Sequence, residues 1–122
     1  MPTPAPEVME FLLSRRSRPA RLLGLPGPDR AEIEPLLTAA ARVPDHGKLE
    51  PWRFVVLRDA GLGRFAQAIQ ARAAETGDDP AKGALAFEQA PVAIAVVGSP
   101  KPSDKAPPIE QTLSTGAVAL GL

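Results

Sequence analysis

"RVPDHGKLEPWRF", residues 42–54, contains the only histidine and the only tryptophan of this 122-residue chain. Five further charged residues occupy the same thirteen positions, with a proline on either side of the charged centre. A turn needs only a Gly, Pro, Asn or Asp, so a turn alone does not account for Arg42, His46 and Trp52. The composition of this stretch therefore predicts a turn that also contacts a ligand.

The overall composition excludes several functional classes. Fourteen basic and fourteen acidic residues cancel, so no net field favours nucleic acid or an anionic membrane as a partner. The absence of cysteine excludes disulfides and thiolate chemistry, and a single histidine excludes a histidine-rich metal site. No apolar run approaches the ~20 residues that span a bilayer, and the N-terminus lacks a signal pattern. We expect one cytoplasmic domain over residues 1–122.

Apolar periodicity around this stretch predicts the order helix, helix, strand, helix, helix, strand, helix. An Asp29–Glu32 capping box begins the second helix, and Gly77 ends the third. This order is typical of an α+β or α/β fold in three layers, with a small sheet between helices. The expected helices cover residues 7–14, about 30–42, 63–76, 81–89 and 109–122, and the expected strands cover residues 53–59 and 91–99.

The pattern in the second half of the chain predicts a fold whose apolar surfaces are not all covered. The nearly continuous apolar run 91–99 indicates a strand covered on both faces. Because two strands make a poor sheet and the last helix ends with the chain, we expect a fold that is incomplete at the C-terminus. The last helix would then leave an apolar face uncovered, which favours self-association. That face consists of Ile109, Leu113, Gly116, Ala117 and Leu120.

"SRRSR", residues 14–18, follows the first helix and is a candidate phosphate site. The guanidinium groups of Arg15, Arg16 and Arg18 match phosphate oxygens in geometry and charge, and the hydroxyl of Ser17 adds a donor. The alternative is a set of solvated cations that complement the helix dipole.

In the turn itself, Asp45 would orient His46 and Lys48 would supply a fixed positive charge. A hydrolytic triad requires a serine in a strand–turn–helix elbow, which this chain lacks. The alternative is a helix-ending turn with a surface histidine. Trp52, which follows Pro51, is more typical of a core anchor than of a stacking platform.

Taken together, four stretches of this chain resemble the nitroreductase family of FMN-dependent oxidoreductases, and within it the compact YdjA-like branch. The resemblance extends from about residue 7 to residue 122, and the pattern R-x-P-D-H-G-K-x-x-P-W-R-F is its most specific part. The stretches are "LLSRRSRPAR", "RVPDHGKLEPWRF", "APVAIAVV" and "IEQTLSTGAVAL".

The resemblance implies an α+β, three-layer fold and a homodimer with FMN in a pocket at the subunit interface. It implies that Arg15, Arg16 and Ser17 hold the FMN phosphate and ribityl chain. Arg42 and His46 would approach the flavin from the turn, across the dimer. No residue is assigned a catalytic role and no metal is implied.

The remaining turn residues receive supporting roles from the resemblance. Pro51 and Trp52 would fix the turn against the sheet. Asp45 would either support a residue that contacts the ligand or cap the turn, rather than act as a base. Lys48 and Glu50 stand where many relatives have Asn or Gln, so their hydrogen bonds to the flavin ring would differ.

The activity implied by the resemblance is hydride transfer from NAD(P)H through FMN to a nitroaromatic or quinone-like small molecule. Relatives continue into a C-terminal segment with a glycine-rich stretch, another strand and further phosphate ligands. This chain would then be the N-terminal two thirds of the family's usual domain. One alternative is a non-catalytic truncated remnant that keeps the dimerising helices and binds flavin weakly or not at all. Another is a small anion-binding module that uses Arg15, Arg16 and Ser17.

Overall fold

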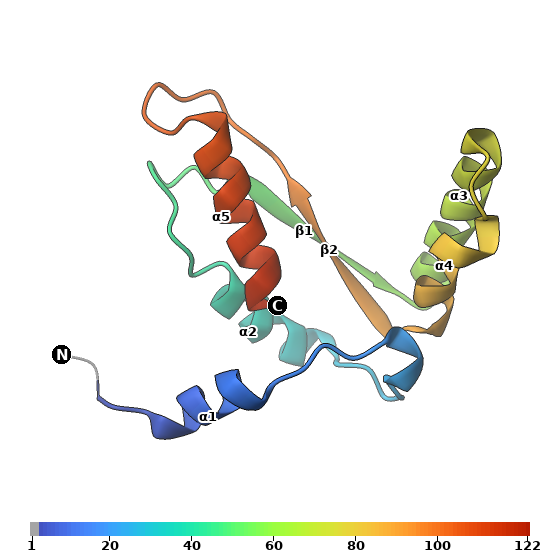
Figure 1. The fold of residues 1–122 in the computed structure, drawn as a ribbon, viewed down its shortest axis with the longest axis horizontal. Coiled ribbons are helices and arrows are strands. Elements are labelled where there is room, and N and C mark those ends of the chain that lie inside the picture. The colour runs from blue at the N-terminus through green and yellow to red at the C-terminus, as the bar shows by residue number, and fades with distance from the viewer. Residues whose placement is uncertain (1–2) are drawn as a thin grey trace.

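A computed structural model describes residues 3–122 of the chain (Figure 1). The elements follow the predicted order of helices and strands, with one additional 3-10 helix between the first two α-helices. They are α1 (Pro6–Ser14), η1 (Ala20–Leu22), α2 (Arg30–Ala40), β1 (Trp52–Arg58), α3 (Ala60–Thr76), α4 (Pro80–Gln89), β2 (Val92–Gly98) and α5 (Pro108–Gly121).

The ends of the helices follow local chemistry. In α2 the Asp29 carboxylate accepts the Glu32 N–H at 2.9 Å, and the Glu32 carboxylate accepts the Asp29 N–H at 2.9 Å, which completes the predicted capping box. The helix ends at Ala40, two residues before the predicted end, as the chain turns toward Pro44. Gly77 ends α3 in the left-handed conformation, as predicted, with φ of 78°.

The two strands form an antiparallel sheet in which Trp52 pairs with Gly98 and Arg58 pairs with Val92. In Figure 1, α2 and α5 lie on one side of this ribbon, and α3 with α4 lies on the other side near its far end. The fold is therefore α+β, with a small sheet between two pairs of helices. The expectation that β2 is covered on both faces is wrong for the described chain. Its residues 92–97 are only half-buried, because in residues 3–122 the helices cover only part of its faces and one of its edges is unpaired.

The buried side chains form two small clusters, one on each side of the sheet. On the contacting helices α2 and α5, the buried apolar residues are Ile33, Ala40 and Val118. On α3 and α4 they are mostly alanines, and Phe65 meets Phe87 edge to face with ring centroids 4.9 Å apart. Small side chains let these helices approach closely but bury little apolar area for each residue.

Two helices present apolar faces to the outside. No residue of α1 is buried, and its Phe11 is 64% exposed. On α5 the predicted apolar face is uncovered within this chain, with Ile109, Leu113 and Leu120 all exposed. Helix α5 approaches α2 closely at its C-terminal end, where a Cβ added to Gly121 would stand 3.3 Å from the Ala40 Cα.

Candidate functional site

The turn between α2 and β1 contains three residues with positive φ and is stabilised by local hydrogen bonds. Gly47, Lys48 and Glu50 have φ values of 79°, 52° and 46°, and each non-glycine residue in this region costs about 1–2 kcal/mol. The Asp45 carboxylate accepts the N–H groups of Leu49 at 3.2 Å and Glu50 at 2.8 Å. Asp45 thus caps the turn, which is one of the two roles that the resemblance implied.

Helix α5 holds the turn from the other side. Ser114 Oγ donates to the Pro44 carbonyl at 2.7 Å, and Thr115 Oγ1 donates to the Pro51 carbonyl at 3.0 Å. Pro51 is fully buried, whereas Trp52 is only half-buried at the start of β1. The buried anchor of this turn is therefore Pro51, and the expectation that Trp52 is the core anchor is corrected. The hydroxyl groups of Ser114 and Thr115, both about two turns into α5, anchor the rest of the turn.

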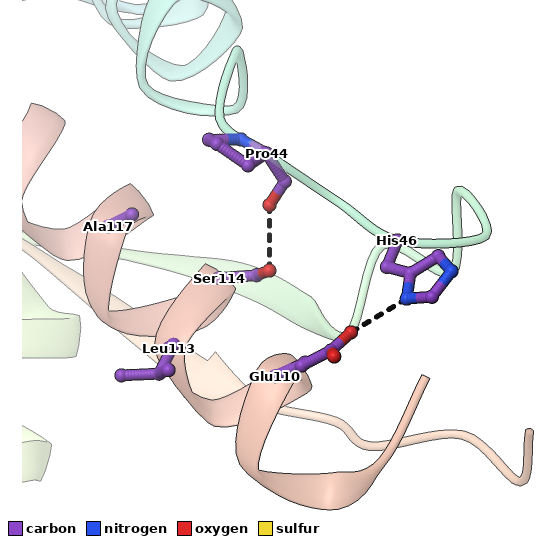
Figure 2. Close-up of a pocket in the computed structure, with 6 residues that line it drawn as sticks. All are labelled: Pro44, His46, Glu110, Leu113, Ser114 and Ala117. Carbon is purple, nitrogen blue, oxygen red and sulfur yellow. Dashed lines mark hydrogen bonds and ion pairs between the residues drawn. The ribbon is translucent and has the colours of Figure 1, made fainter. Parts of the chain in front are cut away.

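His46 meets a residue that the sequence did not single out. His46 Nδ1 lies 2.7 Å from Glu110 Oε2, and the two side chains are 56% and 46% exposed. Figure 2 shows this pair at one end of an open pocket of about 320 Å³, also lined by Ser114, Leu113 and Ala117. An acidic residue in the first turn of a helix is common for dipole reasons alone, so Glu110 carried no signal in the sequence.

The N-terminal end of α5 is fixed by Gln111, the residue after Glu110. The Gln111 side chain is buried; its Nε2 donates to the Lys101 carbonyl at 2.8 Å and to the Ala106 carbonyl at 3.1 Å. Its Oε1 accepts the Lys101 N–H at 2.8 Å. A glutamine in a helix is usually exposed, so this clamp was not visible in the sequence either.

The arginine-rich stretch lies on a different part of the surface. Arg15, Arg16 and Ser17 follow α1 and are exposed; Arg16 Nη1 donates to the Arg15 carbonyl at 3.2 Å. Arg42 follows α2 and is exposed as well. In residues 3–122 no hydrogen bond or ion pair joins Arg15, Arg16 or Ser17 to Arg42 or His46, and Figure 1 draws α1 apart from α5. The structure places Arg42 and His46 in one turn and leaves the other three outside it.

Two further features bear on the chemistry. Across residues 3–122 no cluster of His, Asp or Glu side chains is arranged to hold a metal ion. Over the same residues, no helix combines the length and the apolar character needed to cross a membrane. The polar groups available to a ligand are guanidinium groups, hydroxyls and an imidazole, and this donor set suits phosphate and hydroxyl-rich ligands.

The amino-acid sequence of the chain is similar to those of two bacterial proteins. The chain is 34% identical to YdjA of Escherichia coli over 119 residues, and 32% identical over 120 residues to a protein of Haemophilus influenzae. Both relatives are named as NAD(P)H nitroreductases, and each match covers 95% of this chain and 64% of the relative.

A solved structure agrees with the sequence relatives. The crystal structure of a nitroreductase-like family protein from Bacillus cereus has a TM-score of 0.70 to this chain at 19% identity, which shows the shared fold. That match covers 99% of this chain and 64% of the other. The family model of the Nitroreductase family matches residues 12–120. By its fold, its relatives and this match over most of its length, the chain belongs to the nitroreductase family.

Proposed function

We propose that this chain contributes the flavin-binding part of an FMN-dependent oxidoreductase and forms a single nitroreductase-like domain over residues 1–122. NAD(P)H would be the electron donor, and a nitroaromatic or quinone-like small molecule the acceptor. The observation that carries the proposal is the family match over residues 12–120, which includes every candidate site residue. Bound FMN would supply the hydride chemistry, and the chain would supply binding and orientation.

The donor groups of the chain fit FMN in kind. Arg15 and Arg16 are exposed guanidinium groups beside the Ser17 hydroxyl, and such a set satisfies a phosphate by charge-assisted hydrogen bonds. Arg42 and the free ring nitrogen of His46 would meet the rest of the cofactor. In the described chain these two sets lie on different surfaces, which favours a site to which two copies of the chain contribute.

The exposed apolar faces support a homodimer with the flavin site at the interface. Helix α1 buries none of its residues within the chain, although Met9, Phe11 and Leu13 are large apolar side chains. Helix α5 leaves Ile109, Leu113 and Leu120 exposed beside the turn. Apolar patches of this kind mark protein–protein contacts, and a partner that covers both would lie next to both sets of donors.

Cofactor titration tests the proposal. Flavin fluorescence is followed as protein is added to FMN or to riboflavin, which lacks the phosphate. FMN should bind at least about tenfold more tightly, because one or two charge-assisted hydrogen bonds to phosphate contribute about 1.5–3 kcal/mol. Equal affinity for the two flavins would remove Arg15 and Arg16 from the phosphate site.

Matched variants assign the residues. Arg15→Ala and Arg16→Ala should weaken FMN binding and leave riboflavin binding unchanged, because only FMN presents a phosphate to them. Arg64→Ala removes an exposed arginine of α3 that is not among the candidate site residues, and it is the control that should change neither. Arg42→Ala and His46→Ala should weaken both flavins while the thermal melt stays near that of the parent.

Light scattering with simultaneous measurement of the visible flavin absorbance tests the oligomeric state. We expect the protein to self-associate, and Phe11→Ser on the α1 face to shift the distribution toward monomer. A monodisperse monomer that carries one FMN per chain would show that a single copy forms the whole site and would overturn the interface proposal.

A further inference from the structure

The imidazole of His46 is held by a single partner within residues 3–122. Its Nδ1 lies 2.7 Å from Glu110 Oε2 on α5. An ionised carboxylate only accepts hydrogen bonds, so the proton in this bond resides on Nδ1 whether the ring is neutral or charged. In a neutral imidazole one nitrogen donates and the other accepts, and the bond made by one sets the role of the other. Nε2 is thus the ring atom left for a ligand.

Helix α5 fixes the backbone of the turn on the same face. Ser114 follows Glu110 by four residues, so the two side chains project from one side of the helix. Ser114 Oγ donates to the carbonyl of Pro44, two residues before His46, at 2.7 Å. Figure 2 shows both bonds reaching from α5 to the turn, with the other ring nitrogen of His46 directed away from Glu110. The position of the turn and the orientation of the ring therefore have separate supports on one helix.

We propose that Glu110 is a positioning residue for His46: it holds the ring in the Nδ1–H form and presents Nε2 to the bound flavin. The identity of the ligand rests on the proposed function, whereas the ring state is a property of the chain without ligand. Both side chains are about half exposed, so the bond contributes the modest amount typical of a surface pair. Its role is to select one of two ring forms rather than to stabilise the fold.

Nitrogen NMR of the flavin-free protein tests the ring state directly. The chain has one histidine, so ¹⁵N-histidine labelling yields a two-bond ¹H–¹⁵N spectrum of a single ring. In the parent protein we expect a protonated Nδ1 and an unprotonated Nε2 in the neutral ring. Glu110→Ala should admit the Nε2–H form. Glu110→Gln should keep only part of the preference for the Nδ1–H form, because its amide can accept from Nδ1–H or donate to an unprotonated Nδ1.

Two controls separate this role from a structural one. Ser114→Ala removes the support of the backbone and should leave the ring in the Nδ1–H form. Glu75→Ala removes an exposed carboxylate of α3, paired with Arg72 at 2.8 Å, and should leave the His46 spectrum unchanged. If Glu110→Ala keeps the protonated Nδ1 of the parent, Glu110 does not select the ring form and the inference is overturned.

FMN titration of the same variants tests the consequence. Glu110→Ala should raise the Kd for FMN by about two- to fivefold, as expected for a half-exposed pair, and Glu110→Gln should give an intermediate Kd. A change of ring form without any change in Kd would overturn the flavin-directed role of Nε2. If neither the parent nor any variant binds FMN, the proposed function fails. A ring form that still responds to Glu110 in that case would show that Glu110 orients His46 without a flavin.

Discussion

Replacing Gln111 with methionine isolates the clamp that fixes the start of α5. Methionine keeps the length and the unbranched stem of glutamine, so the change removes polar atoms without opening a large cavity. Gln111→Met deletes three hydrogen bonds, two to the main chain of Lys101 and one to the carbonyl of Ala106. The residue before it, Glu110, then loses the fixed position from which it reaches His46.

The expected cost follows from what becomes of the three partners. Each bond contributes about 1 kcal/mol net, and a buried carbonyl left without a donor costs about 1–3 kcal/mol. Lys101 is exposed, so water replaces its two lost bonds, whereas Ala106 is buried and its carbonyl loses its donor. We expect Gln111→Met to lower the free energy of unfolding by about 2–4 kcal/mol and the Tm by roughly 8–16 °C for a chain of this length.

Urea and thermal unfolding followed by circular dichroism measure the loss, and hydrogen exchange localises it at the Lys101 amide. The matched control is Gln70→Met on α3, which removes one exposed bond to Glu88 and should cost less than about 0.5 kcal/mol. If the two variants unfold at the same urea concentration, or the Lys101 amide exchanges no faster in Gln111→Met, the clamp does not hold the loop before α5.

Three further substitutions test other parts of the fold by the same unfolding assay. Asp45→Ala removes two backbone bonds from a turn with left-handed Lys48 and Glu50, so it should cost about 1–2 kcal/mol; a neutral result would show that α5 alone holds the turn. Gly27→Ala places a Cβ 2.8 Å from the Pro91 Cβ and should cost about 1–3 kcal/mol, whereas Gly24→Ala, with nothing within 4 Å, is the neutral control; equal melts would contradict the contact. Phe87→Ala removes the edge-to-face contact with Phe65 and should cost about 1–3 kcal/mol of unfolding free energy. This is less than for a fully buried Phe, because Phe87 is only half-buried. No loss of stability would mean that the alanines of α3 and α4 hold the two helices together.

The sequence pointed to candidate residues for the site but not to the contacts that those residues make. The unusual stretch at residues 42–54 and the arginine pair after α1 were visible as residue types at short spacing, because charge, imidazole and proline stand out against a polar loop. The partner of His46 is 64 residues away along the chain. A bond of that span depends on how α5 packs beside the turn, and no local pattern encodes it.

For the fold as a whole, the sequence by itself determined the order of helices and strands and most of their ends. Those features rest on local causes: the capping box at Asp29 and Glu32, the left-handed end at Gly77, and apolar runs with a helical or extended period. The tertiary structure alone decided that β2 is half-buried, that Pro51 rather than Trp52 is the buried anchor, and that Gln111 is clamped inside. The burial of a residue depends on which elements pack against it in the folded protein. The hydrophobicity of the sequence shows only which side chains are stabilised when they are removed from water.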